Sequence, residues 1–169
     1  MPWALDEPQT VDEKIELLRR FRGQFDLDQN FVYGVFSLDE SEVVGGTGLH
    51  PRVGDGGLEI GYWVSAAAVG RGYATELSAA LTRVAFALRD VDRVHIHVDP
   101  ENVASARVPR KLGFVEEATL RRRLPPRRPG EARCDQMTFT MLREELAESP
   151  CAEARVRGFD AAGRELSIS

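Results

Sequence analysis

Hydrophobic and polar positions near the start of the chain alternate with a helical period. Thr10 and Glu13 have the spacing of a capping box, in which the Thr10 side chain accepts from the Glu13 amide and the Glu13 carboxylate reaches back. We therefore predict an amphipathic helix that begins just after Thr10. Its apolar side is formed by Ile15, Leu17, Leu18, Phe21 and Phe25.

Three apolar runs with a strand pattern follow this helix. They read NFVYGVFSL, VVGGTGLH and LEIGYWVSA, and the turns DESE and RVGDGG separate them. Because the turns are short, the runs predict an antiparallel meander. Alternation in the last run places its residues on opposite faces of the sheet. One face takes Leu58, Ile60, Tyr62 and Val64, and the other takes Glu59, Gly61 and Trp63.

The pattern then changes to helices between strands. Apolar spacing predicts a helix near 71–89, and RVHIHV predicts a strand, so the order implies a crossover and a parallel strand pair. NVASARVPRKLGF predicts a helix if Ser105 is its N-cap, because Pro109 then falls in the first turn, and Gly113 ends it. FVEEATLRRR and CDQMTFTML close the domain as a strand pair. The fold class is therefore α+β.

The length of 169 residues suits one compact domain. We place that domain at 1–147 and a C-terminal extension at 148–169, where EARVRGFDAAGRELSI predicts a hairpin. The start of the chain lacks the pattern of a secretory signal, and no long apolar run occurs, which predicts a cytoplasmic protein that does not bind membranes.

Charge and cysteine usage exclude several function classes. The formal net charge of -5 argues against a general nucleic-acid binder. The basic run RRRLPPRR at 121–128 is typical of an exposed loop, although it would also suit an acidic partner. Cys134 and Cys151 have neither metal-ligand nor redox-pair spacing. We therefore predict no metal and two reduced thiols.

The stretch VGRGYATE carries two glycines, Gly70 and Gly72, at a strand-to-helix junction. An anion at a helix N-terminus meets unpaired amides and the positive end of the helix dipole. The spacing is not that of a P-loop. A dinucleotide fingerprint fits poorly, because Thr75 stands at its third glycine and antiparallel strands precede it. A glycine turn without a ligand is the other interpretation.

Together, LEIGYWVSAAAVGRGYATE and RVHIHVDPENVASARVPRKLGF resemble the GNAT acyltransferase superfamily, in the branch of the RimJ/RimL-type N-acetyltransferases. The resemblance covers roughly residues 1–145. It implies a central, mostly antiparallel sheet with a parallel splayed strand pair and helices on both faces. It also implies direct transfer of an acetyl group from acetyl-CoA to a primary amine, either a protein N-terminus or a small molecule.

The resemblance implies where acetyl-CoA binds. The family signature Q/R-x-x-G-x-G/A is matched except at Val69, and the implied pyrophosphate cradle consists of Gly70, Arg71, Gly72, Tyr73, Ala74 and Thr75. The pantetheine arm is expected to pair with backbone near Trp63 and Val64, as an added strand would. Backbone amides of that strand would also polarise the thioester oxygen.

The same resemblance implies roles for Asn102 and Ser105, which match the N-x-x-S of the Rim-type branch. Asn102 would contact the pantetheine arm, and Ser105 would hydrogen-bond the departing thiolate, unless its hydroxyl caps the helix instead. Many relatives carry a tyrosine acid further along this helix, but that position is Pro109 here.

Removal of the amine proton needs a base, most of all for a lysine. Glu59 is the first candidate, acting through a water, and a plain surface carboxylate is the alternative. His97 and Asp99 are alternative bases at the end of the next strand. His50 could line the acceptor pocket and Trp63 could wall it, although both residue types are also common in packed positions.

Two further expectations concern assembly and function class. Relatives carry a strand and a helix before the segment that begins here at Met1, so either this unit is missing or the start is misassigned. A bare sheet edge would be covered by the C-terminal hairpin or by a second subunit in a homodimer. A non-catalytic acyl-CoA sensor would keep the glycine cradle without a base. An NAD-dependent enzyme is the third class.

Overall fold

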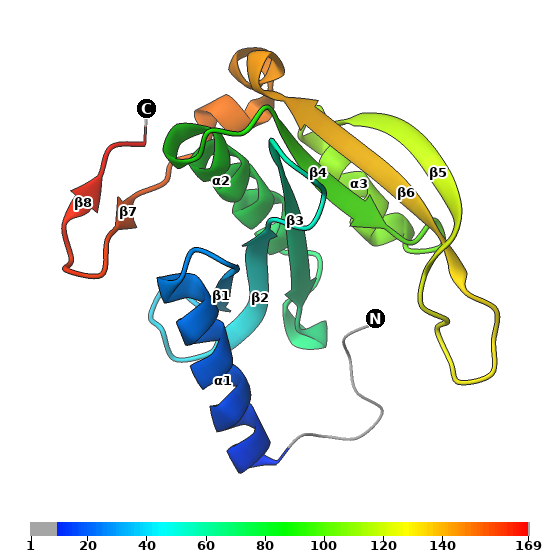
Figure 1. Ribbon diagram of the computed structural model, residues 1–169, viewed down its shortest axis with the longest axis horizontal. Helices are drawn as coiled ribbons and strands as arrows, with labels where there is room; N and C mark the ends of the chain where they lie inside the picture. The colour runs from blue at the N-terminus through cyan, green and yellow to red at the C-terminus, as the bar shows by residue number, and fades with distance from the viewer. Residues whose placement is uncertain (1–9, 169) are drawn as a thin grey trace.

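The centre of the molecule is a sheet in the order β1-β2-β3-β4-β6-β5 (Figure 1). The computed structural model describes residues 10–168. Within them, β3 and β4 are parallel and the other neighbours are antiparallel, which confirms the predicted meander, crossover and closing strand pair. The strands are β1 Phe31–Phe36, β2 Val43–His50, β3 Gly57–Val64, β4 Arg93–Val98, β5 Val115–Leu124 and β6 Cys134–Leu142.

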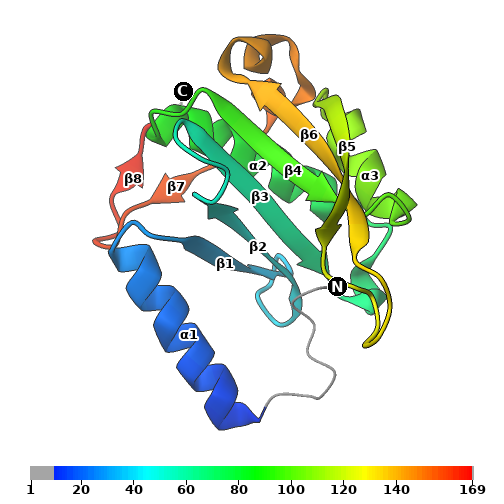
Figure 2. The ribbon, with the colours of Figure 1, turned by 45° about the vertical axis from the view of Figure 1, so that its right-hand side comes forward.

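Helices α1 Val11–Asp26, α2 Tyr73–Leu88 and α3 Val103–Lys111 surround this sheet. α1 begins at the predicted capping box: the Thr10 hydroxyl accepts from the Glu13 amide at 3.3 Å, and the Thr10 amide donates to the Glu13 carboxylate at 2.8 Å. It lies beside β1, whereas α2 and α3 pack together against the sheet (Figure 2). These elements confirm the predicted fold class.

The two faces of the sheet differ in chemistry because side chains alternate along each strand. One face supplies the core with Ile60, Ile96 and Phe139, which pack with α2 and α3. The other face carries polar side chains, among them the buried Glu59 and His95. The alternation predicted for Leu58–Val64 is therefore correct, and it places chemistry on one face and packing on the other.

The parallel pair is short. β3 and β4 are in register only at Gly57 with Arg93, Leu58 with Val94 and Glu59 with His95. Beyond Glu59 the two strands separate, as the resemblance implied (Figure 1). The edge of β3 from residue 60 to residue 64 therefore has no strand beside it on that side within residues 10–168.

The start of α3 differs from the prediction. Asn102, and not Ser105, is the N-cap: its Oδ1 accepts from the Ser105 amide at 3.1 Å. Pro109 consequently lies inside the helix, where it cannot donate to the Ser105 carbonyl. The Tyr62 hydroxyl donates to that carbonyl instead, at 3.2 Å, so the helix tolerates the proline.

After β6 the chain forms two short 3-10 segments, Arg143–Glu148 and Pro150–Glu153, and then a hairpin of β7 Gly158–Phe159 and β8 Glu165–Leu166. In the part of the chain that the structure describes, these strands pair only with each other, so the predicted hairpin is present but adds no strand to the β1 edge. The start of the predicted domain, residues 1–9, lies outside the described residues. None of the helices found in residues 10–168 has the length and apolarity to cross a membrane.

Candidate active site

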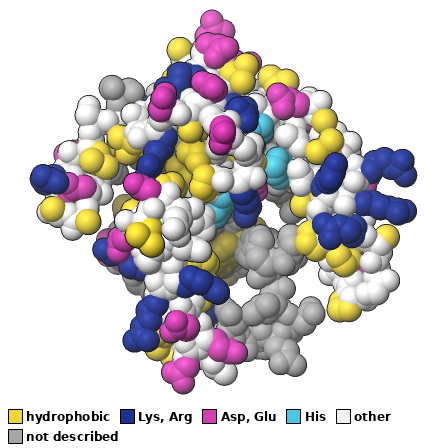
Figure 3. Space-filling model, viewed as in Figure 1, with side chains coloured by type: hydrophobic (Ala, Val, Ile, Leu, Met, Phe, Trp, Pro, Cys, Tyr) yellow, Lys and Arg dark blue, Asp and Glu magenta, His cyan; other side chains and the backbone are white. Residues whose placement is uncertain are grey.

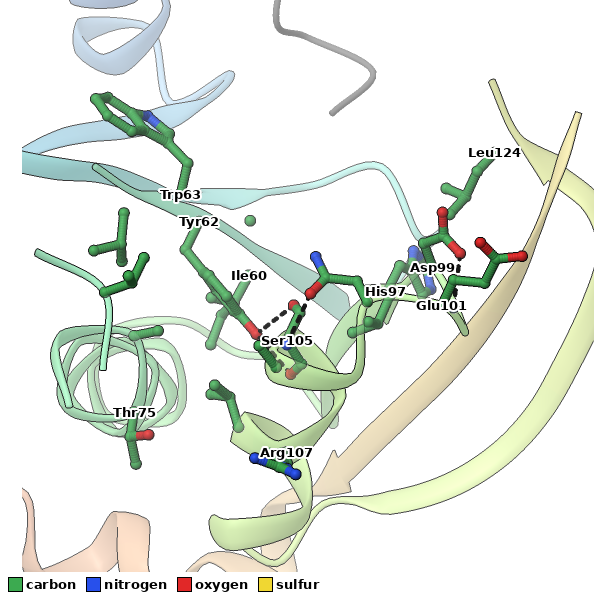
Figure 4. Close-up of a pocket in the computed structure, with 18 of the residues that line it drawn as sticks. Ile60, Tyr62, Trp63, Thr75, His97, Asp99, Glu101, Ser105, Arg107 and Leu124 are labelled. Carbon is green, nitrogen blue, oxygen red and sulfur yellow. Dashed lines mark hydrogen bonds between the residues drawn. The ribbon is translucent and has the colours of Figure 1, made fainter. Parts of the chain in front are cut away.

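The separation of β3 from β4 opens a cleft of about 1060 Å³. Its walls are the free edge of β3, the loop into α2, the end of β4 and one side of α3. Thr75 and Arg107 lie toward one end of it, and Asp99, Glu101 and Leu124 toward the other (Figure 4). The cleft thus reaches from the α2 N-terminus to the β5–β6 hairpin.

The glycine loop presents unpaired backbone donors to this cleft. Gly70 and Gly72 have φ of +78° and +91°, the left-handed region that favours glycine. Thr75 and Glu76 both donate to the Gly72 carbonyl, at 2.9 and 3.0 Å. The amides of residues 70–74, in contrast, find no backbone or side-chain acceptor among residues 10–168. Consecutive unpaired amides at the N-terminus of a 16-residue helix form an anion site.

Most of the residues predicted to bind the cosubstrate line the cleft together. They are Trp63, Val64, Gly70, Gly72, Tyr73, Ala74, Thr75, Asn102 and Ser105. The Arg71 side chain does not line it and is exposed, and the Thr75 amide is already bonded. Two cations that the sequence reasoning missed, Arg107 and Lys111, do line it. Their spacing from Ala104 on one side of α3 was the signal available.

Ser105 and Tyr62 form a pair in the cleft wall. The two hydroxyl oxygens are 3.0 Å apart, and Figure 4 shows the Tyr62 ring pointing at the start of α3. Burial raises the pKa of Tyr62, so the phenol stays protonated; because its hydrogen goes to the Ser105 carbonyl, its oxygen accepts from the Ser105 hydroxyl. Since Asn102 caps the helix, the Ser105 hydroxyl is not used as a cap.

Glu59 also lines the cleft, but its carboxylate is already engaged. Arg52 donates from Nε to Oε2 at 2.7 Å and from Nη2 to Oε1 at 2.5 Å, and His97 Nδ1 lies 3.3 Å from Oε2. Burial alone would raise the pKa of Glu59, but Arg52 and His97 outweigh it and lower that pKa to about 2. This geometry argues against the predicted role of Glu59 as the base, because a clamped carboxylate is a poor proton acceptor.

The alternative base Asp99 is likewise occupied. Arg127 donates to its two oxygens at 2.8 and 2.6 Å and also contacts Glu101 at 2.8 Å. The hydrogen bond from Arg127 lowers the pKa of Asp99. Arg127 belongs to the run Leu124, Pro125, Pro126 and Arg127, which lines the far end of the cleft.

His50 does not line the cleft, contrary to expectation. Its Nδ1 is 2.5 Å from the Asn30 side-chain oxygen, and the ring lies against the glycines of β2 and β3. Burial and the nearby Arg52 lower the pKa of His50, so the ring is a neutral packed group. No cluster of metal-ligating side chains occurs among residues 10–168.

The fold is a mixed sheet that opens between two parallel strands onto a helix N-terminus, and similarity to known proteins identifies its family. Residues 1–115 match the acetyltransferase (GNAT) domain family. The chain therefore belongs to the GNAT acetyltransferase family. Among curated proteins it is similar to the probable N-acetyltransferase YjcK of Bacillus subtilis, with 27% identity over 120 residues. These residues are 69% of this chain and 66%, just under two thirds, of YjcK.

Solved structures show the same fold. Mycobacterium smegmatis RimJ in complex with CoA-disulfide is 27% identical with a TM-score of 0.76, over 97% of this chain and 78% of that one. The ribosomal-protein-S5-alanine acetyltransferase from Vibrio fischeri is 19% identical with a TM-score of 0.73, over 86% and 80% of the two chains. The second likeness concerns the fold alone.

Proposed function

We propose that the protein is an acetyl-CoA-dependent N-acetyltransferase that transfers the acetyl group directly to a primary amine. The observation that carries the proposal is the cleft itself, in which the edge of β3 that β4 leaves lies in one wall with the backbone amides of residues 70–74, for which no acceptor occurs among residues 10–168. A ligand that fits both needs a strand-like amide chain joined to a diphosphate. Acetyl-CoA has this chemistry, and RimJ, which is similar, was solved with CoA-disulfide.

The residues present fit the cosubstrate along its length. A Cβ added at Gly70 or Gly72 would meet no atom within 4 Å, so the space in front of these amides is open to an anion. Arg107 and Lys111 add positive charge to the same wall. The backbone of Trp63 and Val64 can bond the pantetheine arm, with the Asn102 amide group near it, and hold the thioester oxygen.

The transfer forms a bond between the amine nitrogen and the acetyl carbon and breaks the bond from that carbon to sulfur. Ser105, whose hydroxyl oxygen lies 3.0 Å from that of Tyr62, is placed to donate a hydrogen bond to the departing thiolate. A direct transfer needs no covalent enzyme intermediate, because the cleft holds both reactants side by side.

The surface beside the cleft favours an acidic polypeptide as the acceptor over a polyamine. Positive side chains gather on the β5–β6 hairpin (Figure 3). Arg121, Arg122, Arg123 and Arg128 are exposed there and make no ion pair with any of residues 10–168. These four arginines, the arginine edge, adjoin Leu124 and Pro125 of the cleft wall. A cationic acceptor would be repelled there.

The remaining proposals concern the location of the protein in the cell and its oligomeric state. Both cysteines are buried free thiols, which supports a location in the cytoplasm. A homodimer stays a prediction that the exposed apolar side chains of α1, Val11 and Leu18, support. Sedimentation of the purified protein tests it, and a monomer at all concentrations would contradict it.

Calorimetric titration with acetyl-CoA, coenzyme A and NAD tests the cosubstrate. We expect binding of acetyl-CoA and coenzyme A, and a loss of at least about 100-fold in Gly72→Glu, because a carboxylate would occupy the anion site. Gly163→Glu is the matched control, since Gly163 also has positive φ and open space but lies in the β7–β8 turn. NAD binding, or equal effects of both substitutions, would contradict the proposal.

Turnover separates the enzyme from a non-catalytic sensor. We expect acetyl-CoA to acetylate the N-terminus of a short Asp/Glu-rich peptide faster than spermidine, as measured by mass spectrometry. Arg121→Glu/Arg123→Glu should slow the peptide about 10-fold and leave spermidine no slower. Arg19→Glu/Arg20→Glu on α1 is the control. Cosubstrate binding with no transfer to any amine would favour the sensor.

A further inference from the structure

We infer that His97, and not Glu59, takes the proton from the attacking amine, while Glu59 and Arg52 act as a positioning pair that fixes the histidine ring. This inference rests on the proposed function, because it assigns a role within the transfer reaction. It assigns the base to an imidazole that lies at the point where β4 parts from β3.

The position of His97 gives it access to the reacting atoms. It lies on β4 two residues beyond His95, the last residue of β4 that pairs with β3. Its side chain therefore lines the cleft (Figure 4). Its side chain is 18% exposed, against 9% for Glu59. A water or an amine in the cleft can therefore reach the ring, while most of the side chain stays packed.

The contact with Glu59 fixes the tautomer of the ring. Glu59 is a carboxylate and can only accept, so the His97 nitrogen 3.3 Å from its Oε2, which is Nδ1, carries the hydrogen. The other nitrogen, Nε2, then has a lone pair. No hydrogen-bond partner for Nε2 occurs among residues 10–168, so it is left to accept a proton from a ligand.

Both carboxylate oxygens of Glu59 are already in contact with donors, whereas His97 has one ring nitrogen without a partner among residues 10–168. Oε2 of Glu59 accepts from both Arg52 and His97, and Oε1 accepts from Arg52. Protonating this carboxylate would break a bidentate ion pair whose Glu59 side chain is buried.

His95, two residues earlier on the same face of β4, shows the contrast. Thr140 Oγ1 donates to the Glu117 carboxylate at 2.8 Å, so it accepts from His95 Nδ1 at 3.0 Å. Arg93 Nε donates to His95 Nε2 at 3.1 Å. Both ring nitrogens of His95 are therefore used within the fold, which makes this residue a control and not a second base.

The charged groups around His97 come from several elements. Glu59 on β3 and Arg52 after β2 form the ion pair, and the His95 ring centroid is 5.9 Å away on β4 itself. The β6 residue in register with His97 is the uncharged Thr138. In the step, the amine proton passes to Nε2 as the new carbon–nitrogen bond forms, and the carbon–sulfur electron pair leaves as the thiolate. The imidazolium afterwards loses its proton to solvent.

The pH dependence of kcat/KM tests the assignment. It is measured with acetyl-CoA and with the acidic peptide or spermidine, whichever is acetylated faster. We expect a wild-type rate that rises with pH through the histidine range. His97→Gln should lose that rising limb and about 100-fold to 1000-fold in rate. Glu59→Gln should keep the limb, with a smaller loss of about 10-fold, because the ring is less well positioned but still present. His95→Gln serves as the matched histidine control.

The opposite ranking would overturn the inference: a limb that survives in His97→Gln together with the larger loss in Glu59→Gln makes Glu59 the base. Nitrogen NMR of the histidine rings gives an independent readout without any cosubstrate. We expect the neutral His97 ring to carry its hydrogen on Nδ1. A hydrogen on Nε2 instead would contradict the assignment of His97 as the base. Absence of cosubstrate binding or transfer would instead refute the proposed function, whatever the tautomer.

Discussion

At the scale of single residues, Tyr62 shows how one side chain serves both the fold and the site. Its hydroxyl occupies the Ser105 carbonyl that Pro109 cannot bond, and it also contacts the Ser105 hydroxyl. The helix that carries Ser105 is thereby tied to β3, and the serine hydroxyl gains a buried, protonated neighbour. The contact would therefore couple the stability of α3 to the role proposed for Ser105.

Replacing Tyr62 with Phe separates the two contributions. The change leaves a carbonyl inside α3 without its donor, so we expect a loss of about 1–3 kcal/mol in the free energy of unfolding. The loss of support for Ser105 should lower kcat about 10-fold with little change in KM. Urea unfolding and steady-state kinetics measure the two effects. Tyr33→Phe is the control, and equal effects of both substitutions would show that only ring packing matters.

Glu59 makes the free energy of unfolding depend on pH. Its pKa of about 2 lies below its ordinary value of 4.5, so the folded state binds this proton less readily than the unfolded state does. The stabilisation is complete above pH 4.5 and is lost as pH falls toward 2. It amounts to at most about 3 kcal/mol. We expect urea unfolding between pH 6 and pH 3 to show this loss, and Arg52→Gln to show much less of it. Parallel curves for the two proteins would contradict the assignment.

At the scale of elements, the sequence predicted those features that depend on residues close to one another in the chain. The capping box at Thr10 and the alternation of Leu58–Val64 depend on neighbouring residues and were predicted correctly. The start of α3 was not predicted correctly, because Asn102 and Ser105 are both good caps. The donor that compensates for Pro109 comes from Tyr62, which is 43 positions before the Ser105 carbonyl that it bonds. The clamp of Arg52 on Glu59 depends on the turn between two strands and on burial, which spacing does not reveal.

The interrupted pairing of β3 with β4 should be visible in amide exchange. Backbone amides of β3 that point to the cleft between residues 60 and 64 lack a strand partner there, so we expect them to exchange fast in the free protein. Saturating coenzyme A should slow their exchange by at least 10-fold, because the pantetheine amides would bond that edge. Amides of β6, paired on both sides, are the internal reference. No change on β3 would contradict the proposed path of the cosubstrate.

At the scale of the whole molecule, the sheet consists of two parts joined at a short seam. The meander β1–β3 forms one part and β4, β6 and β5 form the other, and α2 connects them along the chain. The cleft and the polar face with His97 both lie at this seam. The arginine edge stands at one end of the cleft, so acceptor and cosubstrate would approach from opposite ends.

This seam has a consequence for how the protein melts. The two parts of the sheet share three registered residue pairs, so the ladder that would make them a single cooperative unit is incomplete. A ligand lying along the gap would complete that ladder with its own amides, and at 100 times its dissociation constant it would add about 2.7 kcal/mol. The free protein should therefore unfold in a broad transition, and the loaded one in a sharper transition at higher temperature. If the proposed function holds, part of the cooperativity of unfolding would come from the bound cosubstrate and not from the chain alone.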